Sequence, residues 1–453
     1  MNYHGFALGL WSCGPPSLHM RAVPVLIVAV CASAADQLTL VLPQTVHQPV
    51  GATTALRGGA AYALGSEAAA TWYNPAMAAS IDAEQLSAGA TAYGFNRIQV
   101  TAGRESDALL SGAVLKIYGG LSARSADGRF GLTAMLCNPV HWSGAVDSGR
   151  TLPNATERSY ASHVRVDQDT WSVQLAGGWR PSDDLQFGVA VVGNYDTVDL
   201  NQSGWTRDIN GRYTATSFTA AAWGTSVQGK LGVRGSPVEH LSLGLSLVTP
   251  GVHVLSGGLV ESSSAQSDPV ANTAASASAR VDDDPFSFVH AWQVGLGAGW
   301  AEPAWEAELD LVWSLPNGTH ETVPPLPGYR TSTVAGVTTL ESILEPARVT
   351  NYRHVLNLRV GGGYNLNERI TLHAGAFTDL SPIGDSQLYN TIDFLGATGG
   401  IMIKRGDTGI ILGTSATWGQ EPVTVFNPAT NTNQDGEIAV FAMDVLLGTV
   451  SKF

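Results

Sequence analysis

The chain has 453 residues, of which only 14 % are charged, with 51 glycines and a formal net charge of −14. A charged share of about half the usual value is atypical of a soluble domain, and the acidic balance excludes nucleic acid as a partner, because phosphate binding needs a basic surface. No run of about 18 apolar residues lies beyond the first 35 positions, which disfavours a transmembrane helix. This composition favours a β-barrel whose apolar residues alternate with polar ones.

The first 34 residues are predicted to be a secretory signal. Arg21 precedes the apolar run 23–30, and Ala32-Ser33-Ala34 forms a small-residue cleavage site. Met20 is an alternative start, and Cys31 leaves open a lipoprotein signal, although Val30 stands where a small residue is wanted. These features place the mature chain outside the cytoplasm.

Removal of residues 1–34 would take away Arg21, so the net charge would change from −14 to −15. It would also leave Cys137 as the single cysteine, which excludes an intramolecular disulfide and a cysteine-based metal site. The histidines have no metal-ligand spacing, no local signature selects a catalytic Ser–His pair, and we expect neither a cofactor, a metal nor an enzymatic activity.

Residues 35–84 are predicted to form a separate, partly helical segment before the barrel. The stretch 56–78 is rich in alanine and glycine, and its helix must end near Asn74-Pro75, because proline cannot continue a helix and restricts the residue before it. Small side chains allow close packing, so we expect this segment to plug the barrel.

From residue 85 onward, segments of 9–16 residues alternate between apolar and small or polar positions. In the segment 185–196, one face carries Leu185, Phe187 and Val189, and the other carries Gln186 and Ala190. Successive side chains of a strand point to opposite faces, so this alternation predicts strands. An even count is expected for a bacterial barrel. We predict fourteen antiparallel strands, at 85–95, 108–118, 129–138, 168–180, 185–199, 212–234, 240–255, 288–301, 304–315, 350–364, 369–379, 393–404, 407–418 and 438–453.

The predicted links between strands alternate in length. Short turns on one side and long loops on the other are typical of outer-membrane barrels, so we place the 85–453 barrel in the bacterial outer membrane. The short turns are 181–184, 235–239, 301–303, 366–368 and 405–406, and the long links are 139–167, 256–287, 316–349 and 419–437.

Three pairs of tryptophans give the height of the membrane band. The members of each pair are eight residues apart, so they lie on one face of a strand with mainly apolar residues between them. Eight residues span roughly 26 Å along a strand, or roughly 20 Å along the membrane normal after a tilt of about 40°. Tryptophan favours both membrane interfaces, which indicates two aromatic girdles. The pairs are Trp171/Trp179, Trp292/Trp300 and Trp305/Trp313.

The opposite faces of two neighbouring strands carry charge, which must point into the lumen because a lipid-facing charge would cost several kcal/mol. These charges either form a polar track for a permeant or satisfy one another as ion pairs inside a plugged lumen, and we favour the ion pairs. At the end of the chain, Phe453 closes an amphipathic strand and resembles an assembly signal of such barrels. The lumen charges are Glu306, Glu308, Asp310, Arg353 and Arg359.

The segment before the barrel resembles the N-terminal hatch of the long-chain fatty acid and hydrocarbon transporters of the outer membrane (FadL/TodX type). The match rests on Gly58-Gly59 and on Asn74-Pro75-Ala76, and the stretch 241–250 is similar to a strand of that family. Met77 and Ala78 stand where family members usually continue Gly-Leu. The candidate hatch and ligand residues are Gly58, Gly59, Trp72, Tyr73, Asn74, Pro75, Ala76 and Met77.

The resemblance implies a 14-stranded barrel with an internal hatch, and passive transport of a hydrophobic ligand that leaves sideways through the wall. A kink at Asn138-Pro139 would supply that lateral gate, because proline cannot donate a ladder hydrogen bond. Expected partners are the ligand, outer-membrane lipid and lipopolysaccharide, and the barrel-assembly machinery, with the protein a monomer. Two alternatives remain open: a barrel of the same family used in protein secretion or assembly, and a general porin.

Overall fold

The computed structural model describes residues 49–81, 84–102, 105–112, 116–150, 159–283, 286–386, 388, 392–427 and 432–453. The predicted signal peptide and residues 35–48 of the predicted plug lie outside this part of the chain. Among the described residues, no helix is both long and apolar enough to cross a membrane.

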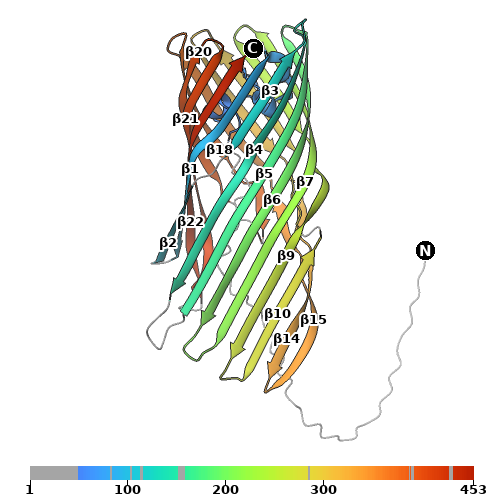
Figure 1. Ribbon diagram of the computed structural model, residues 1–453, viewed down its shortest axis with the longest axis vertical. Helices are drawn as coiled ribbons and strands as arrows, with labels where there is room; N and C mark the ends of the chain where they lie inside the picture. Colours follow the sequence, from blue (N-terminus) through green and yellow to red (C-terminus); the bar gives the residue numbers. More distant parts are fainter. Residues whose placement is uncertain are drawn as a thin grey trace, which may run out of the picture. The chain divides into compact units, whose positions relative to one another are not determined.

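Fourteen antiparallel strands form a closed barrel, as predicted (Figure 1). The wall closes where its first strand pairs with its last over 85–102 and 436–452. The wall strands are β1 (Gln85–Ala102), β2 (Glu105–Gly112) with β3 (Ile117–Arg124), β4 (Phe130–Arg150), β5 (Ser159–Ser182), β6 (Leu185–Arg207), β7 (Tyr213–Val238), β8 (Leu241–Val248), β11 (Gln293–Ala301), β12 (Trp305–Ser314), β17 (Val355–Asn365), β18 (Ile370–Asp379), β20 (Phe394–Arg405), β21 (Thr408–Asn427) and β22 (Thr432–Lys452).

The second wall strand departs from the prediction of one strand over 108–118. It consists of two pieces, because β2 pairs with β1 at 95–102 whereas β3 pairs with β1 at 85–90. The β3–β4 ladder ends at the pair Tyr118–Cys137, directly below Asn138-Pro139. Within the described residues, the wall ladder therefore stops at this height between its second and third strands.

Two of the four long links that we predicted as loops contain additional hairpins, so the prediction was wrong there, and the other two are shortened because the flanking strands extend into them. The links 139–167 and 419–437 mainly lengthen β4, β5, β21 and β22. The links 256–287 and 316–349 form hairpins that continue the wall beyond the girdles. Strands outside the membrane need no lipid-facing apolar side, so these hairpins lack the alternation by which the wall strands were predicted. The added strands are β9 (Val252–Asp268), β10 (Thr273–Asp282), β14 (Leu326–Val334) and β15 (Val337–Glu345).

All five predicted tight turns are confirmed, and they lie at the end of the barrel that also holds the C-terminus (Figure 1). The Phe453 N–H donates to the Glu84 carbonyl oxygen at 3.0 Å, so the two ends of the wall meet at this rim. We call this the short-turn rim. The opposite end is the mouth.

The outer surface of the wall is apolar between the two predicted girdles. Leu175, Leu309 and Leu358 are among the exposed side chains there, and each lies on the lipid-facing side of a different strand. Such an outward apolar band is the mark of a transmembrane barrel. The chain is thus an integral outer-membrane type of barrel.

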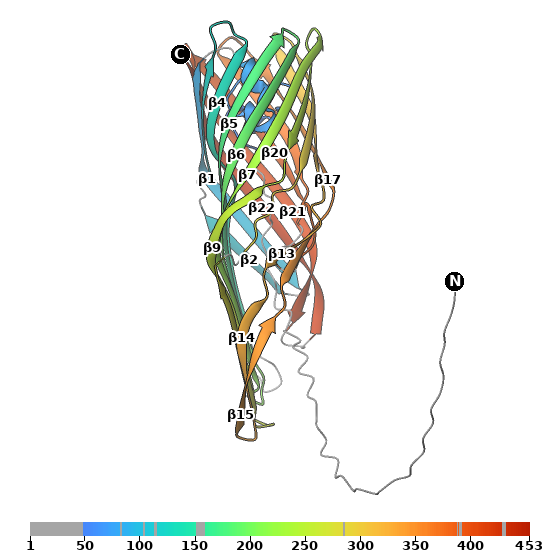
Figure 2. The same cartoon turned by 90° about the vertical axis from the view of Figure 1, so that its right-hand side faces the viewer.

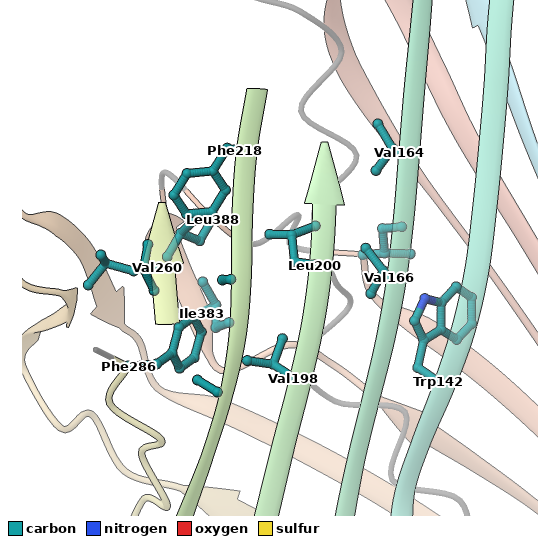
Figure 3. Packing of buried hydrophobic residues seen from close by; sticks show 14 of the residues in the cluster. Trp142, Val164, Val166, Val198, Leu200, Phe218, Val260, Phe286, Ile383 and Leu388 are labelled. Carbon is teal, nitrogen blue, oxygen red and sulfur yellow. The ribbon is translucent and has the colours of Figure 1, made fainter. Parts of the chain in front are cut away.

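An apolar cluster packs inside the barrel toward the mouth, and part of it is drawn in Figure 3. Inward residues of β4–β7, such as Trp142, Leu200 and Phe218, pack against Phe286 and Ile383 from the connections inside the barrel. We call it the mouth cluster. A small sheet contributes to it, made of β13 (Thr319–Val323), β16 (Arg348–Tyr352) and β19 (Ile383–Ser386).

Candidate functional site in the lumen

Residues 49–81, called here the N-terminal segment, lie against the inner face of the wall near the short-turn rim (Figures 1 and 2). The segment contains α1 (Thr53–Leu56), α2 (Ala70–Tyr73) and the 3-10 turn η1 (Pro75–Ser80). After α1 the chain reverses through Gly58 and Gly59, whose φ angles of 68° and 76° favour glycine. The predicted end of the alanine-rich helix at Asn74-Pro75 is confirmed.

The wall receives the segment on glycines that point inward. A Cβ added at Gly188 would lie 2.2 Å from the Ala76 nitrogen, and one at Gly131 would lie 1.8 Å from the Ala78 oxygen. Real Cβ atoms do not approach backbone so closely, so the fit depends on the missing side chains. We call this set the glycine seat, and it consists of Gly120, Gly131, Gly178, Gly188, Gly232, Gly244, Gly361 and Gly375.

Asn74 is the polar centre of the Asn74-Pro75-Ala76 motif. Its side chain is fully buried and donates to the carbonyls of Tyr62 at 2.7 Å and Val233 at 3.1 Å. Its Oδ1 accepts from the Ala76 N–H at 3.1 Å, which caps η1. The motif therefore ties two parts of the segment to each other and to β7, while the following Met77 is buried among the same residues.

Two carboxylates of β12 contact the segment directly. Glu308 accepts from the backbone N–H groups of Ala63 at 2.5 Å and Leu64 at 3.0 Å, and Asp310 accepts from that of Ala61 at 2.9 Å. Arg57 bonds Glu308 at 3.0 Å and pairs with Glu306 at 3.2 Å. Three of the predicted lumen charges are thus brought together around the segment.

Two cations from different wall strands, β7 and β17, lie on the aromatic residues of the segment. The Lys230 Nζ donates to the Trp72 carbonyl at 2.8 Å and lies 3.6 Å from the centroid of its ring. Arg359 donates to the Gly59 carbonyl at 3.4 Å and lies 5.2 Å from the centroid of Tyr73. Within the described residues, neither cation forms an ion pair with a carboxylate.

The two tyrosines of the segment pack edge to face, with ring centroids 6.0 Å apart. The Tyr73 hydroxyl accepts from the Val50 N–H at 2.7 Å and donates to the Val50 carbonyl at 3.1 Å. Burial raises the pKa of Tyr62 to about 12, and burial also raises the pKa of Tyr73. Both phenols are therefore neutral hydrogen-bonding groups.

A cavity of about 160 Å³ lies on the mouth side of the segment, and Tyr62, Trp72 and Tyr73 form part of its lining. One side is polar and includes Gln228 and Lys230; the other is apolar and includes Val312 and Leu380. The volume is close to that of an engineered cavity of about 150 Å³ that binds benzene. A ligand in this cavity would contact both the segment and the wall.

The polar side of the cavity contains a buried carboxylate with full partners. Asp196 accepts from the Thr170 hydroxyl at 2.7 Å and lies 2.9 Å from the His290 Nε2. Asn194 continues this side by donating to Gln228 at 2.9 Å. These residues satisfy one another, whereas Lys230 and Arg359 line the cavity without a carboxylate partner among the described residues.

The wall is irregular at Asn138-Pro139, where the β4–β5 register shifts between Cys137 and Val140. Asn138 is buried and donates to Asp169 at 3.0 Å, while Pro139 lines the cavity. A second, smaller cavity of about 40 Å³ reaches Asn138 from the side of β1. The cavity and the interruption of the wall are therefore adjacent.

The remaining predicted residues lie apart from the cavity. Arg353 pairs with Asp393 at 3.2 Å near the mouth, away from Arg359. Phe453 is 79 % exposed at the short-turn rim. The structure places the six predicted girdle tryptophans on the outer face: Trp179, Trp292, Trp300, Trp305 and Trp313 are exposed, and Trp171 is partly exposed.

Sequence reasoning missed Lys230, Asp196 and His290. Lys230 and Asp196 stand on the polar faces of predicted strands, so their inward direction could have been inferred from alternation. Their partners, in contrast, come from distant parts of the chain. The described residues contain no cluster of His, Cys and acidic side chains that could hold a metal ion.

Comparison with solved structures decides the fold. A Pseudomonas aeruginosa FadL homologue matches with a TM-score of 0.60 and 14 % identity, covering 91 % of this chain and 99 % of that chain. The chain has the FadL-type barrel fold. The P. putida toluene transporter TodX (TM-score 0.63, 14 % identity, 90 % and 99 % covered) and the Ralstonia pickettii toluene transporter TbuX (0.54, 13 %, 90 % and 99 %) share this FadL-type fold. No family model and no curated protein matches the chain.

Proposed function

We propose that the chain is a passive outer-membrane transporter for hydrophobic molecules such as long-chain fatty acids or hydrocarbons, with the N-terminal segment as its hatch. The observation that carries the proposal is the cavity, because its lining combines Trp72 and Tyr73 of the segment with an apolar wall surface. A ligand bound there would sit between the mouth and the segment. Structural neighbours include toluene transporters, which supports a hydrophobic ligand.

The proposed route begins at the mouth and ends in the membrane. The mouth cluster is a buried apolar core that borders the cavity through Phe288 and Tyr352, so a poorly soluble molecule would pass between its apolar side chains to reach the cavity. The interruption of the wall at Asn138-Pro139 supports a sideways exit, since the ladder ends there. Such an exit would deliver the ligand to the surrounding lipid and lipopolysaccharide layer without a polar passage through the short-turn rim.

Lys230 favours fatty acids within this class. Lys230 is 5 % exposed and its ammonium contacts Trp72, so a carboxylate entering the cavity would gain a charge-assisted hydrogen bond from it. A hydrocarbon would gain no such bond. We expect Lys230→Met to lower fatty-acid uptake about tenfold and leave toluene uptake unchanged, because a hydrogen bond to a charged group is worth about 1.5–3 kcal/mol.

The test is uptake of radiolabelled oleate and of toluene by a deletion strain that carries the wild-type gene, Lys230→Met or Lys404→Gln. Lys404 lies at the short-turn rim and is exposed, so it serves as the matched control. Equal uptake of both compounds with and without the wild-type gene would refute transport. Liposome swelling separates the porin alternative, since a porin admits sugars that a plugged barrel excludes. The secretion or assembly alternative predicts no ligand uptake but a secretion defect in the deletion strain.

A further inference from the structure

Four consecutive residues of the N-terminal segment, 61–64, aim their backbone N–H groups at two carboxylates of one wall strand. Ala61 and Tyr62 donate to Asp310 Oδ2 at 2.9 and 3.4 Å, and the next two N–H groups donate to Glu308. Successive N–H groups that converge on an anion form a nest. Here the anion belongs to the wall, so the nest joins segment to barrel.

The other wall contacts of the segment are of a different kind. The glycine seat provides close packing, and single bonds from Gln174, Arg234 and Thr398 reach segment carbonyls. In the described part of the chain, only β12 presents carboxylates to the segment. Hydrogen bonds that involve an ionised group are roughly twice as strong as neutral ones. The two β12 carboxylates accept five such bonds from the segment, whereas Lys230, Arg234 and Arg359 each donate one to a segment carbonyl, so the largest group of these bonds lies at a single strand.

We propose that Glu308 and Asp310 are positioning residues that form a latch with residues 61–64 and Arg57, and that this latch holds the lumen closed to polar solutes. The proposal rests on the N-terminal segment acting as the hatch. It adds where the hatch is held by carboxylates: among the described residues this is β12 alone, whereas the cations Lys230, Arg234 and Arg359 each bond a segment carbonyl.

The latch is suited to release because its carboxylates are deeply buried only while the segment is present. The Glu308 side chain is 0 % exposed against Arg57. A buried carboxylate has lost its hydration, and departure of the segment would return it to a water-filled lumen. Hydration of the carboxylates would then offset part of the free energy lost with the broken hydrogen bonds. The free-energy difference between the closed and open states is therefore smaller than the number of hydrogen bonds implies.

The latch also touches the cavity. Tyr62 lines the cavity with its ring and donates its N–H to Asp310, and Arg359 lines the cavity while it bonds the Gly59 carbonyl. A ligand that displaces either residue therefore disturbs the latch directly. This contact connects occupation of the cavity with release of the segment.

The variant Glu308→Gln/Asp310→Asn tests the latch, because it replaces both carboxyl groups by amides of nearly the same volume. We expect the rate at which arabinose enters proteoliposomes to rise about ten- to hundred-fold, since each charged hydrogen bond lost is worth about 1.5–3 kcal/mol. Glu302→Gln, on the exposed turn before β12, is the matched control and should stay closed. A double variant as tight as the wild type would overturn the proposal.

A disulfide staple distinguishes release of the segment from damage to the barrel. A Cβ at Gly120 would lie 2.8 Å from the Ala68 Cβ, so Ala68→Cys with Gly120→Cys, in a Cys137→Ala background, can bridge segment and wall after they separate by about 1 Å. The same cysteine pair in a barrel with intact Glu308 and Asp310 is the control for that shift, and it should stay impermeable to arabinose when oxidised. Oxidation should return the double variant to the wild-type rate, and reduction should reopen it. A leak that persists in the oxidised protein would also overturn the latch. Failure of the transport proposal would instead appear as absent oleate and toluene uptake by the unaltered protein.

Discussion

Individual glycines define how the segment meets the wall. Gly188 and Gly193 belong to the same strand, yet a Cβ at Gly188 would collide with the backbone of Pro75 and Ala76, whereas one at Gly193 would meet nothing within 4 Å. The difference follows from alternation, because the two residues point to opposite faces. Adding one methyl group, the Cβ of alanine, is therefore expected to disturb packing at Gly188 on the inner face but not at Gly193 on the outer face.

We expect Gly188→Ala to displace the segment and destabilise the folded protein by about 1–3 kcal/mol, the usual cost of overpacking. Gly193→Ala should change stability by much less, since no atom stands in its way. The midpoint of denaturant unfolding in detergent measures both. Equal midpoints for the two alanine variants would show that the segment does not rest on this part of the wall.

At the scale of elements, the strands of the wall face lipid over only part of their length, and the rest of the wall extends into water. Leu309 of β12 is 48 % exposed between two girdle tryptophans of its strand, whereas Leu340 of β15 is 69 % exposed on the hairpin beyond the wall. Exposure alone therefore does not mark the membrane. Position along the strand relative to the girdles does.

Leu309→Arg is expected to destabilise the membrane-embedded protein by about 2–4 kcal/mol, the cost of a lipid-facing arginine near the bilayer centre. Leu340→Arg should cost about 0–1 kcal/mol, because that side chain faces water. Reversible unfolding from phospholipid vesicles gives both values. If the two substitutions were equally costly, the hairpin would have to lie within the bilayer.

The part of the fold that could be read from the sequence is the part that the membrane dictates. Alternation revealed the wall strands because lipid demands an apolar side. It failed for β9 and β10, where the stretches 262–267 and 274–279 carry serine and alanine on both faces, with one glutamine. The candidate site was harder. Lys230 and Trp72 are 158 positions apart, and nothing local in either segment indicates that they meet.

Glu308 and Asp310 illustrate the same limit. Their alternation placed them in the lumen, but the carboxylates were expected to pair with other wall charges. Their partners are instead mainly backbone N–H groups of residues 61–64. Backbone groups carry no sequence signal, so that contact could not be predicted.

At the scale of the whole molecule, each wall strand that borders the membrane presents apolar side chains outward. Leu132, Leu231 and Leu412 are examples from well-separated strands of the wall, and all are exposed. Lipid can cover this belt, so the described part of the wall can be satisfied without a protein partner.

We therefore expect a monomer by native mass spectrometry after gentle release from detergent. A substitution in the belt, such as Leu231→Ala, should leave this mass unchanged. A stable dimer or trimer would contradict the expectation and would indicate that part of the belt is a subunit interface.

The pairing of β1 with β22 has a consequence for biogenesis. The pairing that closes the barrel cannot form until the last strand has been synthesised. Residues 49–81 are synthesised before every wall strand, so they are present throughout assembly of the wall. A chain with buried contacts on so many strands could not easily thread into a finished cylinder. The wall must therefore assemble around the segment. The contacts of the segment with the wall glycines would then help to set the curvature of the wall before β1 and β22 pair.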